Sequence, residues 1–130
     1  MRKRLLITFC LFIIPSVSLA EEDCPLKGKW HSDEKATIEQ MEKYGNVTEK
    51  QRKFFSKNFF GKLTIEYSCT EAMSYYEGTV ETGKYEITKR NGNTLEVESS
   101  YGKKKITLAG DCYLMSLEPL TFSEVFCKVK

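Results

Sequence analysis

Alternation of apolar and polar residues in the second half of the sequence constrains the fold most strongly. Apolar side chains recur at every second position in four segments, at Leu63, Ile65 and Tyr67, at Tyr85 and Ile87, at Leu95 and Val97, and at Ile106 and Leu108. A period of two puts successive side chains on opposite faces of a β-strand. Segments of this kind, spaced by about ten residues with turn residues between them, predict an antiparallel meander.

The hairpin at residues 85–97 can be aligned by its turn. Asn91-Gly92 is normally a two-residue turn, but that register would put Ile87 opposite Glu96, with one of them on the wrong face. A three-residue loop at residues 90–92 instead places Ile87 opposite Leu95, with Gly92 in the left-handed conformation. The same register places Tyr85 opposite Val97. We expect this second register.

The last hairpin, at residues 112–127, folds about Pro119-Leu120. This register sets Tyr113 opposite Phe126 and Leu114 opposite Val125. It also brings together the two cysteines that end the hairpin, Cys112 and Cys127.

The cysteine count indicates a protein made for an oxidising compartment. Apart from Cys10 near the N-terminus, four cysteines remain, at positions 24, 69, 112 and 127. An even number in an exported chain predicts two disulfides. The hairpin register pairs Cys112 with Cys127 and leaves Cys24 for Cys69. Neighbouring-strand disulfides have restrictive geometry, so a pairing of Cys24 or Cys69 with Cys112 stays open.

A short helical insert precedes the meander. A first strand is expected at residues 27–31, and Ser32 follows as a helix N-cap with acidic residues in the first turn. Ile38, Met41 and Tyr44 recur at helical spacing, and Gly45 can end the helix. Residues 48–51 have the form of a capping box and open a second helix, which is expected to continue to Gly61. Phe55 and Phe59 lie on one face of it. Both helices are too short to be stable alone, so their apolar faces must pack on the rest of the domain.

The N-terminal twenty residues have the composition of a bacterial signal peptide. Arg2, Lys3 and Arg4 precede an apolar run that is too short to span a bilayer, and residues 18–20 form a small-x-small cleavage site. We therefore expect export, to a bacterial periplasm or as a secreted protein. Without this segment, 17 basic residues stand against 18 acidic ones. The basic run at residues 103–105 is interpreted as the exposed start of a strand, and no nucleic-acid binding is expected.

Residues 21–130 are long enough for one domain with a modest core. The strand count predicts a mainly β fold, an antiparallel up-and-down barrel of about eight strands with a helical hairpin between strands one and two. A closed barrel removes exposed edges. A barrel of this size is either filled by side chains or holds one small ligand.

This organisation resembles the calycin superfamily, which groups lipocalins with fatty-acid-binding proteins. Gly28-Lys29-Trp30 is similar to the G-x-W of the calycin first strand. The resemblance implies that Trp30 closes one end of the barrel beneath Lys128. The helices at residues 33–60 occupy the position of the helical lid of fatty-acid-binding proteins. The last strand lacks the Arg-x-Tyr with which many of those proteins hold a carboxylate, so that headgroup site is not carried over.

The predicted ligand-binding residues are the inward-facing side chains of the barrel and the aromatic face of the second helix. They are Leu63, Ile65, Tyr85, Ile87, Leu95, Val97, Ile106 and Leu108 on strands, with Phe55 and Phe59 on the helix. The expected ligand is a small apolar molecule.

A role in protein interaction is the alternative function, for example as an inhibitor of an envelope or host enzyme. It would use an acidic or aromatic loop, with residues 71–77 as the candidate. An enzyme is ranked last, because a single histidine, His31, with scattered acids does not make a catalytic constellation. Zinc is not expected from scattered cysteines and one histidine, and no cofactor is predicted.

Overall fold

The computed structural model describes residues 24–130. The expected signal peptide, its cleavage site and Cys10 lie outside these residues. The elements, in chain order, are β1 (Gly28–Ser32), α2 (Glu34–Tyr44), α3 (Glu49–Phe55), β2 (Thr64–Tyr67), β3 (Glu71–Tyr76), β4 (Thr79–Asn91), β5 (Thr94–Ser99), β6 (Gly102–Ala109), β7 (Cys112–Ser116) and β8 (Ser123–Lys128).

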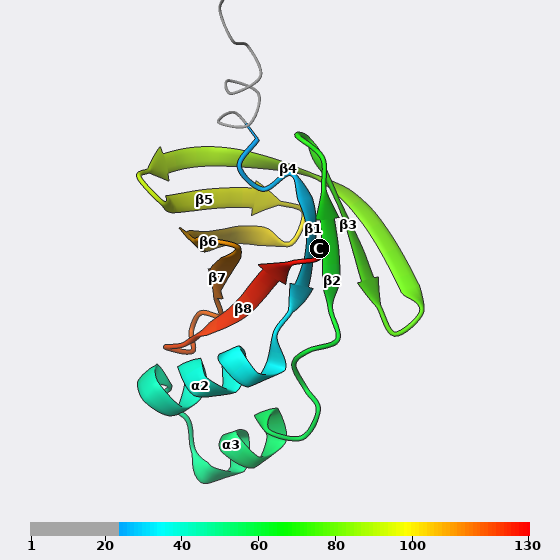
Figure 1. Cartoon of the computed structure of the whole chain (residues 1–130). Helices are drawn as coiled ribbons and strands as arrows, with labels where there is room; N and C mark the ends of the chain where they lie inside the picture. The colour runs from blue at the N-terminus through cyan, green and yellow to red at the C-terminus, as the bar shows by residue number, and fades with distance from the viewer. Residues whose placement is uncertain (1–23) are drawn as a thin grey trace, which may run out of the picture.

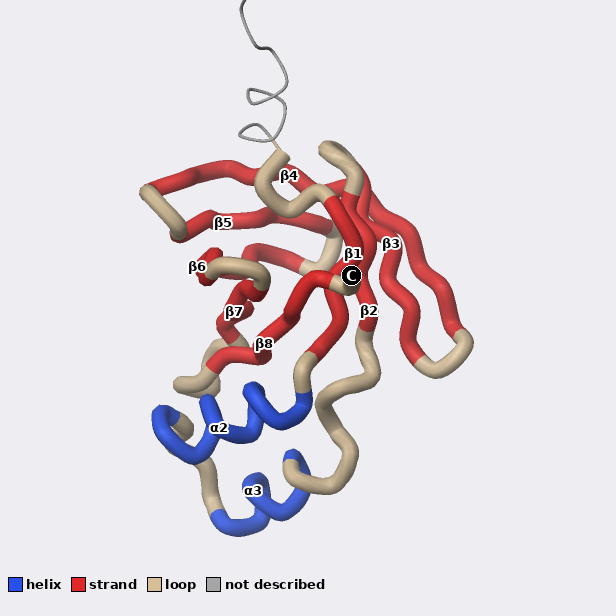
Figure 2. Tube along the Cα trace, in the orientation of Figure 1, coloured by secondary structure: helices blue, strands red, loops and turns tan. Residues whose placement is uncertain are grey.

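The eight strands form one closed antiparallel barrel in which each strand pairs with its neighbours in sequence and β8 returns to β1. Figure 1 shows the curved sheet wrapping round on itself, and Figure 2 shows both helices gathered beneath one end of it. The predicted fold class, an up-and-down barrel with two helices between the first two strands, is confirmed. The two ends of the barrel differ, and are called here the disulfide end and the helical end.

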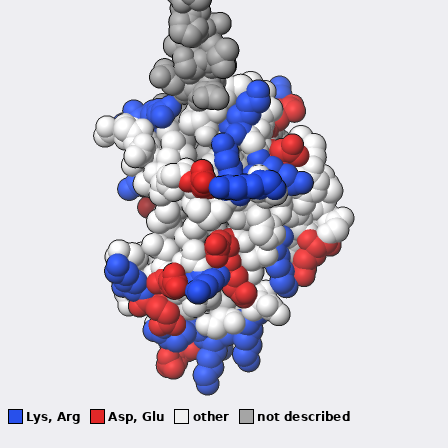
Figure 3. All heavy atoms as spheres, in the orientation of Figure 1, with Lys and Arg blue, Asp and Glu red and all other residues white. Residues whose placement is uncertain are grey.

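Acidic and basic side chains are interspersed over the face of the molecule that Figure 3 shows, on the helices as well as on the barrel. This mixture agrees with the near balance of charges beyond the N-terminal segment. A field of one sign, which is the usual mark of a nucleic-acid surface, is not seen on this face.

The disulfide end is closed by the chain that enters β1. Leu26 is fully buried, and its carbonyl accepts a hydrogen bond of 2.8 Å from the indole Nε1 of Trp30. Lys128 Nζ lies 5.3 Å from the centre of the Trp30 ring, which is within cation–π range. Gly28 has a φ of +132°, and a Cβ there would lie 3.3 Å from Lys128 Cε. The glycine of the G-x-W pattern is therefore required by backbone conformation and by space.

Behind Trp30, aromatic rings fill this end of the barrel. Tyr113 packs between Trp30 and Phe126, with ring centres 4.9 Å and 5.1 Å away. The hydroxyls of Tyr113 and Tyr67 share a hydrogen bond of 2.8 Å. Burial raises the pKa of Tyr67 to about 12 and raises that of Tyr113 as well, so both hydroxyls remain protonated at neutral pH. The buried phenols satisfy one another, as buried polar groups must.

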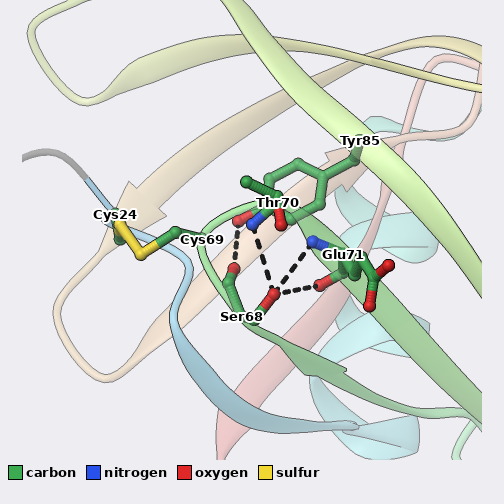
Figure 4. The surroundings of a disulfide bond; sticks show 6 residues. All are labelled: Cys24, Ser68, Cys69, Thr70, Glu71 and Tyr85. Carbon is green, nitrogen blue, oxygen red and sulfur yellow. Dashed lines mark hydrogen bonds between the residues drawn. A yellow bond between two sulfur atoms is a disulfide. The ribbon is translucent and has the colours of Figure 1, made fainter.

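Both disulfides lie at the same end. Cys112–Cys127 joins directly paired residues of β7 and β8, and Cys24–Cys69 ties the start of the described chain to the β2–β3 turn. Figure 4 shows how that turn is held, with Ser68 Oγ accepting from the backbone N–H groups of Thr70 and Glu71. The Tyr85 hydroxyl donates to the Ser68 carbonyl at 2.6 Å. These are the pairings that the last hairpin's register indicates.

The helical insert agrees with prediction except at its boundaries. Asp33, not Ser32, is the N-cap of α2 and accepts from the Ala36 N–H at 2.9 Å, while Ser32 ends β1. Thr48 and Gln51 form the predicted capping box of α3. That helix ends at Phe55, well before Gly61, and the residues between them form turns. Asn58 has a φ of +57°, in the left-handed region, so a right-handed helix cannot continue through it.

Helix α2 takes the place of a strand partner beside the lower half of β8. Strand β1 pairs with β8 over only three residues. Beyond that point Asp33 N–H donates to the Val125 carbonyl, and Val125 N–H donates to Thr37 Oγ1, at 2.8 and 2.9 Å. Thr37 is fully buried, whereas the predicted core residue Tyr44 is 53% exposed. Met41, also predicted, is fully buried with Ile38 packed beside it, so the helix docks through this apolar face and through the Thr37 hydroxyl that satisfies the backbone of β8.

The register predicted for the hairpin at residues 85–97, which is formed by β4 and β5, is wrong. Asn91 pairs with Thr94 around a two-residue turn, and Ile87 pairs with Val97 instead of Leu95. The register shifts between Ile87 and Lys89. This β-bulge absorbs the extra residue, so a two-residue turn is compatible with Ile87 and Val97 on the same face.

The last hairpin has the predicted register, with Tyr113 opposite Phe126 and Leu114 opposite Val125. The loop expected at residues 71–77 is instead mostly strand β3. It pairs with β4 along its whole length and with β2 from Ala72 to Tyr75, so an irregular interaction loop is excluded there.

The two disulfides should contribute unequally to stability. Cys24–Cys69 spans 45 residues and Cys112–Cys127 spans 15. Because the entropy lost by the unfolded chain grows with loop length, the double variant Cys24→Ala/Cys69→Ala should lower the free energy of unfolding by about 1 kcal/mol more than Cys112→Ala/Cys127→Ala. Urea denaturation of both variants measures the difference, and an equal or reversed loss would contradict this account.

Candidate functional site

The barrel wall opens along the first half of β4. Residues Thr79 to Lys84 pair with β3, whereas pairing with β5 begins only at Tyr85, opposite Ser99. The β5–β6 turn follows at once, so the β3–β4 hairpin extends past it, as Figure 1 shows at the lower right of the barrel. From Thr79 to Lys84, β4 therefore has no hydrogen-bonded neighbour on the β5 side, and the barrel wall is open there.

A cavity of about 590 Å³ lies behind this opening. The lining comes from each strand from β2 to β7 and from the β5–β6 turn, and it combines apolar side chains with hydroxyl and charged groups. The apolar part includes Leu63, Ile65, Tyr67, Ala72, Val97, Ile106 and Met115, and the polar part includes Ser74, Tyr76, Glu81, Ser99, Tyr101 and Lys104.

Five of the predicted barrel residues line this cavity: Leu63, Ile65, Tyr85, Val97 and Ile106. The other three, Ile87, Leu95 and Leu108, do not. Leu95 is fully buried, and Ile87 and Leu108 pack against the same core toward the disulfide end. Alternation shows which side chains point into the barrel. It does not show whether the interior at that height is packed or hollow, so it could not separate the cavity-lining residues from the core residues.

A second cavity, of about 490 Å³, lies at the helical end and contains the two remaining predicted residues, Phe55 and Phe59. It shares Leu63, Tyr76 and Lys104 with the barrel cavity. Residues 117–120 of the β7–β8 loop complete its wall. The shared residues make the two cavities neighbours, so the barrel interior adjoins the aromatic face of the insert. A further hollow of about 680 Å³ is lined only by residues 118–122 of that loop and by Ser116 and Ser123 at the ends of its strands.

The phenylalanines at the helical end form one cluster of unequal burial. Phe60 is buried and contacts Phe55, Phe59 and Phe122, with ring centres between 4.9 and 6.1 Å apart. Phe59 is 41% exposed and Phe54 is 59% exposed. The cluster is thus part core and part surface.

Glu124 is the buried charge-bearing group at this end. Its side chain comes from β8 and lines the helical-end cavity. Its Oε2 accepts a 2.7 Å hydrogen bond from Ser32 Oγ, which in turn accepts from the Gly61 N–H at 3.0 Å. Burial raises the pKa of Glu124, and the Ser32 hydrogen bond opposes this only in part. The three residues link the first strand, the end of the helical insert and the last strand.

The sequence analysis did not predict the polar residues of the site. Ser74 and Tyr76 belong to β3, whose inward positions are small or polar and give no hydrophobic period. Glu81 stands at the cavity rim, where its carboxylate accepts from the hydroxyl of Tyr101. Lys104 lies inside a run of three lysines that was interpreted as exposed. A stricter use of strand alternation through residues 103–105 would have turned the middle lysine inward.

No metal-binding cluster and no membrane-spanning helix is present between Cys24 and Lys130. This part of the chain contains no group of three or more His, Cys, Asp or Glu placed to hold a metal ion. His31 is exposed, and its Nδ1 lies 2.6 Å from Thr64 Oγ1. Among the same residues, neither helix has the length and apolar character needed to cross a bilayer.

Comparison with protein-family models, with curated proteins and with solved structures gave no match for this chain.

The buried carboxyl makes a pH-dependent contribution to stability. Because the pKa of Glu124 is raised in the folded protein above its ordinary value of 4.5, its contribution is greatest below that pH and falls as pH rises through the folded pKa. Glu124→Gln keeps an acceptor for Ser32 and cannot ionise. It should therefore be more stable than the wild type at pH 7, with the difference closing near pH 4, as measured by thermal unfolding.

The exposed Glu86 on the outer face of β4 provides the control. Glu86→Gln should change the free energy of unfolding by less than about 0.5 kcal/mol. A loss of stability at pH 7 in Glu124→Gln would show that the ionised carboxylate is stabilising, contrary to this account.

Proposed function

We propose that this protein is an exported calycin-like barrel that binds one small, largely apolar molecule, rather than an enzyme. The observation that carries the proposal is the cavity of about 590 Å³ inside the barrel, adjoining a second cavity under the helical insert. Ligand sites in proteins generally measure roughly 300–1,000 Å³, with apolar walls and a few polar groups. The barrel cavity has a volume in this range, and its wall combines apolar side chains with a few polar groups.

The contrast between the two ends of the barrel supports the same conclusion. The disulfide end is filled by Leu26, Trp30, Tyr113 and Phe126, all of them buried. At the helical end, by contrast, the inward side chains of Leu63, Ser74 and Lys104 border the open cavity of about 590 Å³. A barrel needed only as a stable scaffold would gain from packing both ends, because unfilled apolar volume costs stability.

The aromatic cluster of the insert is suited to be the ligand's entrance. Phe55 and Phe59 line the second cavity, and Phe59 is also 41% exposed. An apolar ligand can therefore meet an apolar surface at the outside of the molecule and pass Leu63 and Tyr76, which line both cavities. The two disulfides indicate an oxidising compartment. We place it in a bacterial periplasm or outside the cell.

The exposed aromatic residues also favour a second candidate, a protein-interaction role such as inhibition of an envelope or host enzyme. Phe54 and Tyr44 on the helical insert are 59% and 53% exposed, and Tyr101 at the cavity rim is 71% exposed. Exposed aromatic side chains are common at protein interfaces. The open cavity is not needed for such a role, and the small-ligand proposal is preferred for that reason.

Filling the cavity from Gly83 should abolish binding without harming the fold. Gly83 lines the cavity from β4, its φ is not in the left-handed region, and a Cβ there would meet only Ser100 Oγ, at 3.9 Å. Gly83→Leu should keep or raise the melting temperature and weaken binding of the neutral fluorescent probe phenylnaphthylamine at least about tenfold, because a cavity occupied by a leucine side chain has less room for the probe. Fluorescence titration measures the affinity.

Glu86→Leu is the matched control. It places the same side chain on the outer face of the same strand, opposite Glu98. Probe affinity should equal that of the wild type. Equal binding by Gly83→Leu and the wild type would show that the probe does not enter the barrel, and would refute the proposed site.

A further inference from the structure

The three consecutive lysines of β6 point in alternating directions. Lys103 pairs with Glu98 and Lys105 with Glu96, all four side chains being exposed on the outer face of the barrel. These are opposite charges on neighbouring strands, a common stabilising arrangement. Lys104 pairs with Val97 and is half-buried, and it lines the cavity.

Lys104 lies where the two cavities adjoin. Of the charged side chains that line either of them, it is the one that lines both; the others are Glu81 and Lys84 in the barrel cavity, and Glu118 and Glu124 in the helical-end cavity. Its neighbours on the same inward face are apolar, with Ile106 two positions along β6 and Met115 beyond it on β7. The half-buried side chain of Lys104 therefore lies beside apolar residues of the cavity wall.

Of the three carboxylates that line the cavities, two are hydrogen-bonded elsewhere, and the third, Glu118, forms no ion pair among the described residues. Glu81 accepts from the Tyr101 hydroxyl, and Glu124 accepts from Ser32 Oγ. Lys84 is at an outward register position, opposite Glu71. Within residues 24–130, the side chain of Lys104 has no hydrogen bond, ion pair or ring contact. A half-buried lysine side chain without a counter-ion favours binding of an anion at its ammonium, because a charged hydrogen bond gains strength where water is partly excluded.

Resting on the proposed function, we propose that the ligand is an amphipathic anion, whose carboxylate, sulfonate, sulfate or phosphate group is bound by Lys104 Nζ while its apolar part lies against Ile65, Ile106 and Met115. The anionic group would lie where the two cavities adjoin, at Lys104, and the apolar part would extend from there into the barrel cavity. The anchor is on β6, and the pairing of Lys103 and Lys105 with glutamates fixes the face to which Lys104 points.

Two probes with the same aromatic skeleton separate the anchor from the cavity. Anilinonaphthalenesulfonate carries a sulfonate, and phenylnaphthylamine is its neutral counterpart. Lys104→Met keeps the length of the aliphatic stem and removes the charge. It should lower affinity for the sulfonate probe about tenfold or more, while affinity for the neutral probe stays the same or rises. Lys104→Arg should retain sulfonate binding.

Lys103→Met is the matched control, because it removes a charge from the adjacent residue on the outer face. Neither affinity should change. If Lys104→Met leaves sulfonate affinity unchanged, or lowers both affinities equally, the anion anchor is refuted while the cavity proposal stands on the neutral probe. If the wild type binds neither probe, the proposed function itself is refuted.

A competition on the wild-type protein tests the same claim without any substitution. Decyl sulfate and decanol share a ten-carbon chain and differ in charge. The sulfate should displace phenylnaphthylamine at about a tenfold lower concentration than the alcohol. Equal displacement would overturn the inference.

Discussion

The barrel closes through only three residue pairs between β1 and β8, and the rest of the structure depends on how that short seam is completed. Backbone groups of β8 left beyond the seam are satisfied by Asp33 and by the hydroxyl of Thr37, which docks α2. Ser32, the last residue of β1, then connects Gly61 to Glu124. The helical insert is thus part of the barrel's closure.

This closure makes the two ends of the barrel unlike. At the disulfide end the entering chain folds under Trp30, and two disulfides hold turns and strands together around an aromatic core. At the helical end a helix replaces a strand, and β4 leaves β5 where the β5–β6 turn begins. Tight packing at the disulfide end stabilises the fold, so the helical end can contain a cavity. Scaffold and candidate site are therefore separated along the barrel axis.

Sequence patterns predicted the features that depend on local chemistry or strict alternation. The strand faces around Leu63 and Ile106, the capping box at Thr48 and the register that brings Cys112 to Cys127 are of this kind. Features set by the closed barrel were missed. Strand β3 has no hydrophobic period because its inward side borders a cavity, and the bulge after Ile87 leaves no mark in the sequence. Lys104 was hidden in a charged run whose exposure was assumed to be uniform.

The central claim is that the hollow end of the barrel holds a small molecule. Native mass spectrometry tests it most directly, on protein recovered from an oxidising compartment without detergent. The account predicts a chain lighter by four hydrogens, two for each disulfide, together with a species carrying one added small molecule that organic extraction removes. A bare chain alone, both as purified and after incubation with phenylnaphthylamine, would contradict it.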